Sequence, residues 1–258
     1  MRKSRVMATI RSGGLVRLCS LGHYVPSFVA QAARAGYECI WLDLEHRALS
    51  IRETQSLLTE CHLFDIDCMV RVPTREKAQL YRYLEDGAAG LMIPHVSTPA
   101  EAKDLVRSTK FPPLGERGFD NAGLDADYYL HSMDDFADWA HSETFLTVQI
   151  ETPEAVENVE AIAATKGVDI LFIGPGDLGY RYRHDGTGDP DGSRLEAAFE
   201  RVAAAAKANG IAWACPTAGA ANIRKRREQG CQMIANAGDF MSILNGLNAG
   251  IREFEEID

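Results

Sequence analysis

The sequence lacks long apolar runs, and it carries fewer positive than negative charges. No apolar stretch approaches the length of a bilayer-spanning helix, and the basic start MRKSRVMATIRSGG lacks the apolar stretch of a signal peptide. The formal net charge of −10 argues against a surface for nucleic acid or anionic membrane. We therefore expect a cytoplasmic protein with neither partner. An anionic substrate is not excluded, because a local arginine or metal ion can dominate the field inside a pocket.

Motifs that would define other kinds of site are also missing. No H-E-x-x-H motif or Cys/His cluster predicts zinc, and no serine lies in a nucleophile elbow. The six cysteines form no C-x-x-C pair, and four of them fall inside or beside apolar runs, so we expect buried free thiols. They are Cys19, Cys39, Cys61, Cys68, Cys215 and Cys231.

The chain instead alternates short apolar runs with amphipathic stretches of helical period. Most of the runs are almost continuously apolar, which is typical of parallel strands covered on both faces. The eight runs are residues 14–21, 39–45, 68–72, 90–96, 144–151, 169–174, 211–216 and 232–237, and the clearest helical stretches are 25–36, 75–86, 98–109, 153–164, 194–209 and 218–229. Eight such units in 258 residues predict an α/β fold, a single (β/α)8 TIM barrel spanning residues 1–258, rather than an open sheet.

Local signals mark the ends of several helices. Thr98-Pro99-Ala100-Glu101 offers a cap, a first-turn proline and a capping-box glutamate, and Thr152-Pro153 repeats the cap and proline. Glycines expected at helix ends are Gly36, Gly87, Gly167, Gly210 and Gly230. Two long segments interrupt the alternation: residues 111–142, which include a short acidic helical piece near 132–141, and residues 180–193. Long connections of this kind are usually functional loops or oligomer contacts.

Two acids end successive predicted strands, Glu151 after TFLTVQI and Asp177 after DILFIGPG. Parallel strands of a barrel place their downstream ends at one rim, where catalytic groups gather. Carboxylates there suit a hard divalent cation such as Mg²⁺ or Mn²⁺, which takes one or two protein carboxylates and fills its other positions with water or substrate oxygens. Taken singly, each acid could instead cap a helix or form a salt bridge.

Earlier strands end in other polar groups. Arg71 ends CMVRVP and can hold a carboxylate or enolate oxygen, or form an inter-strand salt bridge with Glu45 or Asp43. His46 ends WLDLEH, where an imidazole beside acids suits a general base, although a structural histidine is more common. Asp43, Glu45 and His46 lie too close together in the sequence for all three to touch the substrate. We therefore expect Asp43 and Glu45 to lie behind the residues that do. His95 carries only a weak signal.

The stretch Gly174-Pro175-Gly176-Asp177-Leu178-Gly179 matches G-x-G-x-x-G, but we reject a dinucleotide site. That motif should open a helix at the start of a βαβ unit, whereas a polar loop over residues 180–192 is expected here. We expect the glycines instead to let backbone N–H groups approach an anionic ligand.

Together these segments resemble the HpcH/HpaI family of metal-dependent (class II) pyruvate aldolases. The likeness covers most of the chain and rests on WLDLEH, RVP, LEDGAAGLMIPHV, FPPLGERGF, VQIETPEAVENV and GVDILFIGPGDL, in that order. The resemblance implies a barrel that assembles as a homo-oligomer, a trimer or hexamer, whose last helix packs on or is exchanged with a neighbouring subunit.

The resemblance also implies roles for individual residues. Glu151 and Asp177 would bind Mg²⁺, Mn²⁺ or a similar ion such as Co²⁺, and Arg71 with Gln149 would hold pyruvate and its enolate. The substrate carboxylate would meet the backbone N–H groups of Gly176 and Asp177. His46 would act as acid and base, supported by Glu85 at the "LEDGA" helix end.

These expectations lead to a divalent-metal-dependent carbon–carbon lyase that cleaves or forms 2-oxo-acid aldol adducts, with a 2-oxo acid and an aldehyde as its small-molecule partners. A decarboxylase or condensing enzyme of the citrate-forming type, acting on oxaloacetate at the same site, is the alternative. A catalytically silent barrel that binds or scaffolds is the alternative of another class. The chain departs from the family pattern at Arg47, where an alanine or glycine is usual, and at Asp86.

Overall fold

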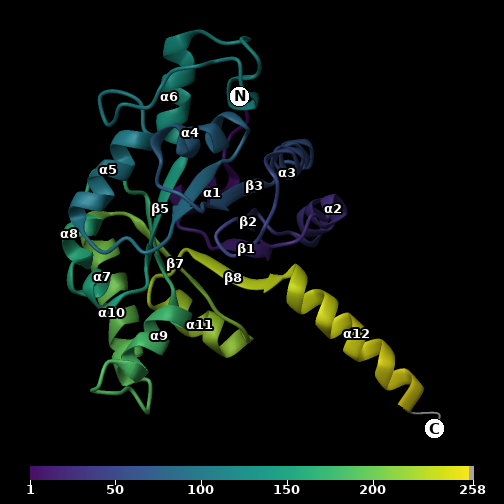
Figure 1. The fold of residues 1–258 in the computed structure, drawn as a ribbon, viewed down its shortest axis with the longest axis vertical. Coiled ribbons are helices and arrows are strands. Elements are labelled where there is room, and N and C mark those ends of the chain that lie inside the picture. The colour runs from purple at the N-terminus through teal and green to yellow at the C-terminus, as the bar shows by residue number, and fades with distance from the viewer. Residues whose placement is uncertain (256–258) are drawn as a thin grey trace.

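The computed structural model describes residues 1–255, and its centre is a closed barrel of eight parallel strands paired in chain order. The strands are β1 (Val16–Leu21), β2 (Cys39–Asp43), β3 (Asp67–Arg71), β4 (Gly90–Ile93), β5 (Phe145–Ile150), β6 (Ile170–Ile173), β7 (Ala212–Pro216) and β8 (Met233–Gly238). Each of the eight apolar runs overlaps one of them, and none of the strands extends more than one residue beyond its run. The predicted (β/α)8 TIM barrel is therefore confirmed (Figure 1).

Helices surround the barrel (Figure 1). They are α1 (Arg5–Arg11), α2 (Pro26–Ala35), α3 (Ile51–Leu63), α4 (Lys77–Glu85), α5 (Pro99–Thr109), η1 (Leu124–Ala126), α6 (Met133–Glu143), α7 (Pro153–Glu157), α8 (Val159–Ala163), α9 (Pro175–His184), α10 (Ser193–Asn209), α11 (Ala220–Glu228) and α12 (Asp239–Glu255). No helix within residues 1–255 is long and apolar enough to cross a membrane.

Side chains alternate between the inside of the barrel and the helix layer, as the pleat of a strand requires. Apolar residues facing inward, among them Met69, Phe145 and Phe172, form one buried cluster, and their neighbours Val70, Leu146 and Leu171 belong to a second cluster beneath the helices. The interior is thus filled, as in other small barrels. The six cysteines are free and buried, as expected.

The end of the barrel at which the strands begin is closed by α1 and the residues before it. Asp67, at the start of β3, is fully buried and accepts hydrogen bonds from the Ser4 hydroxyl (2.6 Å) and the Val6 N–H (2.9 Å). Arg2 pairs with the same carboxylate. Substrate access from this end is blocked, because Val6 itself is buried in the cluster that fills the barrel.

The predicted helix boundaries hold where capping chemistry marked them. Thr98 and Glu101 form a capping box, and Thr152 accepts a hydrogen bond from the N–H of Ala155. All five glycines expected at helix ends adopt positive φ: Gly36, Gly87, Gly167, Gly210 and Gly230. Residues 132–141 contain most of α6, as predicted.

One local prediction was wrong. Residues 180–184 are not a loop but the second half of α9, so the glycine-rich stretch does open a helix. Pro175 occupies the first turn, where a missing N–H costs nothing, and Tyr182 is buried within that helix. The glycines of GPGDLG and the charges of RYRH, which follows it, masked the helical pattern.

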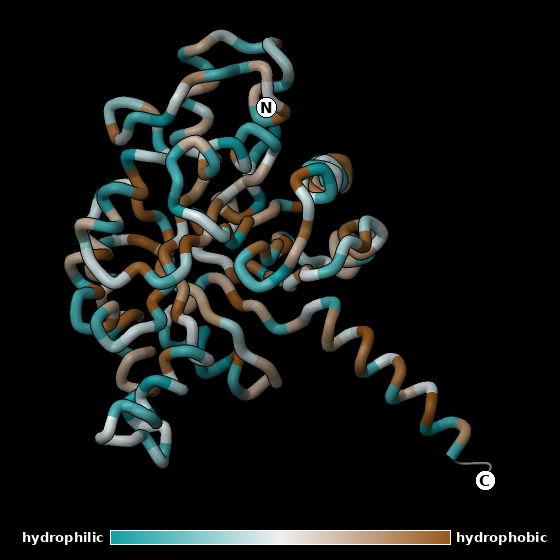
Figure 2. Tube along the Cα trace, in the orientation of Figure 1, coloured by the Kyte–Doolittle hydropathy of each residue, from teal (hydrophilic) through white to brown (hydrophobic). Residues whose placement is uncertain are grey.

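The last helix, α12, projects from the barrel instead of packing back on it (Figure 1). Apolar residues along it are exposed, and the hydropathy colouring of the trace shows apolar segments spread over the length of this helix (Figure 2). They are Phe240, Met241, Ile243, Leu244, Leu247, Ile251 and Phe254. Beside its base, a groove lined by apolar residues of α2 and β8 lies open, including Phe28, Ala32 and Ala237.

Candidate functional site

Polar side chains replace the apolar interior at the end of the barrel where the strands finish. On β2 and β3, the inward-facing pair Trp41 and Met69 is followed two residues later by the pair Asp43 and Arg71. On β5, Gln149 faces inward and Glu151 follows with the same alternation. The strand register therefore brings these side chains to one mouth, as the sequence predicted.

Arg71 is held by two carboxylates. Its Nε and Nη2 lie 3.0 and 2.9 Å from the two oxygens of Asp43, and its Nη1 lies 3.1 Å from Glu45. The guanidinium also lies over the Trp41 ring, 4.8 Å from its centroid. Burial alone would raise the pKa of Asp43, but the hydrogen bonds and charge of Arg71 outweigh it and lower that pKa. The guanidinium of Arg71 is thus fixed in orientation before any ligand binds.

Asp43 also shapes the turn that presents His46. Its Oδ1 accepts hydrogen bonds from the backbone N–H groups of Glu45 (3.1 Å) and His46 (3.3 Å). The imidazole of His46 is 56% exposed, and its Nε2 lies 3.6 Å from Glu45. His46 therefore lies at the rim with most of its imidazole exposed to solvent.

Glu151 lies deeper and is 2% exposed. Its Oε1 accepts a hydrogen bond from the backbone N–H of His95 at 2.7 Å. The Nδ1 of the His95 ring lies 3.0 Å from the same oxygen. Burial is the main reason that the pKa of Glu151 is raised; the contact with His95 opposes this, and the charges of Glu45 and Asp177 add to it. A bound cation would act in the opposite direction to burial and favour the carboxylate form of Glu151.

His95, which the sequence marked only weakly, connects the two halves of the mouth. Its Nε2 lies 3.3 Å from Glu45 while its Nδ1 faces Glu151. Its φ of 56° lies in the left-handed region, an uncommon conformation for a residue other than glycine. Its place directly after a strand was the available signal, but a lone histidine gives no indication of its partners.

The donor set fits a divalent cation. One ligand atom from each of His95, Glu151 and Asp177 lies within 4.8 Å of the others. Asp177 comes from the first turn of α9, where backbone N–H groups have no partner within the helix. A Cβ on Gly174 would lie 2.6 Å from the Glu151 Oε2, so the absence of a side chain there makes room for that oxygen. The buried Oε1 of Gln149 has no hydrogen-bond partner among the described residues.

The structure does not bring Glu85 to His46 within one chain. Glu85 ends α4, and the following turn enters β4, so Glu85 lies at the opposite end of the barrel from the mouth. It lines a surface pocket with Asp86 and Asp120. Burial, opposed by Arg117 and reinforced by nearby acids, raises the pKa of Glu85 to about 7. Its predicted support of His46 stays a prediction that requires a contact between copies.

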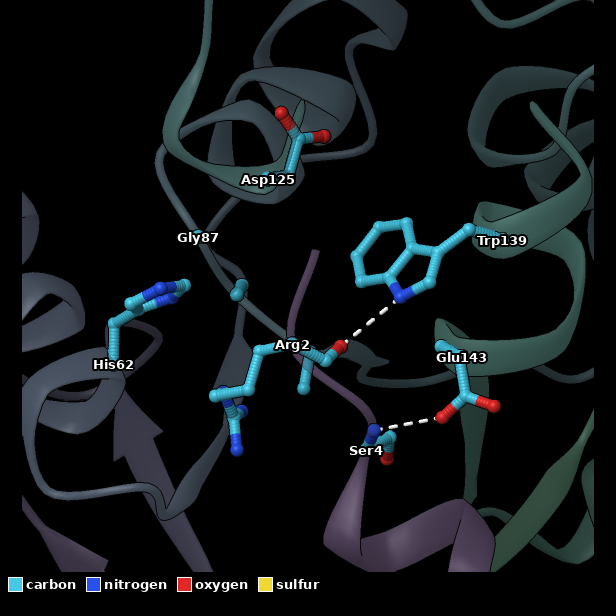
Figure 3. A pocket seen from close by; sticks show the side chains of 9 residues that line it. Arg2, Ser4, His62, Gly87, Asp125, Trp139 and Glu143 are labelled. Atoms are coloured by element: carbon cyan, nitrogen blue, oxygen red, sulfur yellow. Dashed lines mark hydrogen bonds between the residues drawn. The ribbon is translucent and has the colours of Figure 1, made fainter. Parts of the chain in front are cut away.

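A second hollow, shown in Figure 3, also lies away from the mouth. It is lined by Arg2, Ser4, His62, Asp125, Trp139 and Glu143, among others. Two of its polar contacts are internal: the Trp139 indole donates to the backbone oxygen of Arg2 and the Ser4 N–H donates to Glu143. Its volume of about 20 Å³ accommodates a water molecule but not a substrate.

Comparison with known proteins identifies relatives along nearly the whole chain. The model of the family described as HpcH/HpaI aldolase/citrate lyase matches residues 21–246. A hydroxypyruvate/pyruvate aldolase of Paraburkholderia phytofirmans is 34% identical over 228 residues, which are 86% of each chain. The crystal structure of an HpcH/HpaI aldolase from Desulfitobacterium hafniense superposes with a TM-score of 0.89 at 30% identity and covers 96% of both chains. That of macrophomate synthase superposes with a TM-score of 0.79 at 26% identity, over 97% of this chain and 88% of its own.

The space beside Glu151 gives a matched pair of glycine variants. Gly174→Ala should displace the Glu151 carboxylate and weaken binding of Mn²⁺ by about 10- to 100-fold, the range typical of changes in groups that orient metal ligands. Gly176→Ala, whose Cβ would meet nothing within 4 Å, should bind Mn²⁺ like the wild type. Titration followed by electron paramagnetic resonance measures free Mn²⁺ directly. Equal affinities in the two variants would contradict the assignment.

The raised pKa of Glu85 makes stability depend on pH. The folded chain binds the proton of Glu85 more tightly than the unfolded chain does. This tighter binding therefore adds to the free energy of unfolding below pH 4.5, and the added stability is lost as pH rises to about 7. Glu85→Gln should therefore lose less melting temperature than the wild type between about pH 5 and about pH 8. Glu200→Gln, at an exposed site on α10, is the control. A wild-type decline retained in Glu85→Gln would contradict this account.

Proposed function

The chain belongs to the HpcH/HpaI aldolase/citrate lyase family, and on this premise we propose that it is a carbon–carbon lyase that cleaves or forms aldol adducts of 2-oxo acids through a pyruvate enolate. The observation that carries the proposal is the joint placement of a carboxylate pair, Glu151 and Asp177, and a fixed guanidinium, Arg71, at one mouth of the barrel. This combination suits a substrate on which negative charge develops during reaction.

Glu151 and Asp177 would hold a divalent ion, Mg²⁺ or Mn²⁺, with His95 either orienting Glu151 or contributing a nitrogen. Oxygen donors of this kind match hard cations. When bound, the ion supplies positive charge that acidifies the methyl protons of a chelated 2-oxo acid.

Arg71 and its neighbours would bind the reacting end of the substrate. The ion pairs with Asp43 and Glu45 fix the guanidinium, so it can donate to the enolate oxygen without reorganising as charge develops. The first-turn N–H groups of Gly176 and Asp177 would receive the substrate carboxylate, as helix N-termini do. The side-chain amide of Gln149 lies beside Gly174 and would contribute to holding the substrate.

His46 would move the proton. In the cleavage direction it takes the proton from the hydroxyl of the aldol adduct, and in the synthetic direction it returns a proton to that oxygen. Its exposed position at the rim, above the buried Glu151, suits a group that acts on the aldehyde half of the adduct.

We also propose that α12 packs on a second copy of the chain in a homo-oligomer, a trimer or hexamer. A (β/α)8 barrel normally covers its last strand with its last helix, whereas here that helix projects and leaves an apolar groove beside β8 (Figure 1). An exposed apolar surface of this extent is typical of an interaction site, and the groove offers a matching apolar surface.

Hydrogen exchange of pyruvate tests the enolate site directly. In D₂O with Mg²⁺, the wild type should remove the methyl signal of pyruvate from the proton NMR spectrum, and EDTA or Glu151→Ala should abolish this exchange. Glu154→Ala, at an exposed position on α7, is the control. Exchange that persists in EDTA would contradict the metal. If neither exchange nor oxaloacetate decarboxylation occurs with Mg²⁺ or Mn²⁺, the chain is not an enolate-forming enzyme and the scaffold alternative is favoured.

The assembly can be tested with a charge placed on α12. Leu247→Asp puts a carboxylate into the apolar face, so it should convert the oligomer to smaller species in sedimentation velocity. Asn248→Asp adds the same charge at the adjacent polar position and should sediment like the wild type. A wild-type chain that sediments as a monomer would overturn the proposal.

A further inference from the structure

Arg47 is a cation at the mouth that the proposed chemistry does not use. It follows His46 after β2, and the sequential order of the eight strands places β2 across the barrel from β6, after which Asp177 lies. A ligand that extends from the Asp177 side past His46 therefore reaches the Arg47 side of the rim. Arg47 is exposed there.

The guanidinium of Arg47 is held in place by contacts that leave its charge free. Its Nη1 donates to the backbone oxygen of His46 (2.8 Å), and its plane lies over the Phe240 ring, 4.5 Å from the centroid. The same ring contacts that of His23, with centroids 4.1 Å apart. His23 is in turn fixed by Asp239, 2.7 Å from its Nδ1.

The backbone is adapted to this arrangement at Gly22. A Cβ on Gly22 would lie 2.6 Å from the Phe240 ring and 3.0 Å from the Arg47 Nε. Only a residue without a side chain lets the ring and the guanidinium approach the end of β1 so closely. The position of Arg47 is therefore built into the rim by three segments: the turn after β1, the turn after β2 and the start of α12.

The charge of Arg47 is not neutralised within the described residues. No carboxylate there lies within the 4.0 Å limit of an ion pair, whereas Arg71 is paired with Asp43 and Glu45. Arg75, in the turn between β3 and α4, is paired with Glu101. Arg47 has five N–H donors, and the one hydrogen bond it makes among residues 1–255 goes to a neutral carbonyl. In a chain with a net charge of −10, this guanidinium is available to an incoming anion.

We propose that Arg47 binds the anionic group at the far end of the aldehyde substrate, so that the preferred aldehydes carry a terminal carboxylate or phosphate. This inference rests on the proposed function. The 2-oxo acid would occupy the Glu151 and Arg71 side, and the aldehyde carbonyl would face His46. The far end of a short aldehyde would then lie near Arg47, which follows His46 in the sequence. A planar guanidinium supported on an aromatic ring suits paired hydrogen bonds to either kind of anion.

The test compares aldehydes of similar length that differ in charge. Wild type, Arg47→Ala, Arg47→Lys and Arg34→Ala are assayed in aldol synthesis from pyruvate with succinic semialdehyde, glyceraldehyde 3-phosphate or butanal. Arg34, exposed in the last turn of α2 at the opposite end of the barrel, is the charge-matched control.

In Arg47→Ala, the ratio of kcat/KM for an anionic aldehyde to that for butanal should fall about 10- to 100-fold, as expected for a lost hydrogen-bonded charge contact. Arg47→Lys should recover part of that ratio, and Arg34→Ala should match the wild type. Loss confined to the semialdehyde identifies the anion as a carboxylate, and loss confined to the phosphorylated aldehyde identifies it as a phosphate.

The outcomes separate this inference from the proposed function. If the wild type exchanges the pyruvate methyl protons and uses aldehydes, but Arg47→Ala lowers kcat/KM for all three alike, then Arg47 only packs against Phe240 and the inference is overturned. The same holds if Arg47→Ala changes only the sedimentation of the protein. If the wild type neither exchanges pyruvate nor uses any aldehyde, the proposed function itself is wrong.

Discussion

A chain of polar contacts across four strand ends organises the mouth of this barrel. It runs from Asp43 through Arg71 and Glu45 to His95 and on to Glu151. Without Arg71, the carboxylates of β2 and the loop after β5 would face one another across a buried space, where like charges destabilise strongly. The permanent charge of the guanidinium lets acids collect here, and the acids in turn fix the guanidinium. The orientation of Arg71, the turn that carries His46 and the position of Glu151 all follow from this mutual constraint.

The ends of the strands were predictable because the sequence carries the pattern locally. Continuous apolar runs predicted the strands, and the two-residue alternation through Asp43 and Arg71 determines that both face inward once the barrel is assumed. The contacts of His95 were not predictable, because they join residues from three different strand ends. The helical half of α9 was obscured by glycines and charges, since its buried contacts are made by only a few residues such as Tyr182.

Glu85 shows the limit of transferring a role by alignment. The motif around it matches the family pattern, yet in one chain the direction of α4 carries it to the other end of the barrel. Sequence similarity places a residue in the chain, whereas its partners depend on the arrangement of copies. The two ends of the barrel thus have separate tasks: Asp67 and α1 secure the fold at one end, and the ionic mouth lies at the other.

The filled interior of the barrel has a kinetic consequence. Because aromatic and aliphatic side chains occupy the space beneath Arg71 and α1 closes the far end, the mouth can be reached only from the end at which the strands finish. Glu151 lies at its bottom, and His46 and Arg47 stand at its rim. A compound bound against Glu151 would have to leave past anything held at the rim. For the proposed reaction, the 2-oxo acid would therefore have to enter before the aldehyde and leave after it, which is a compulsory order of binding.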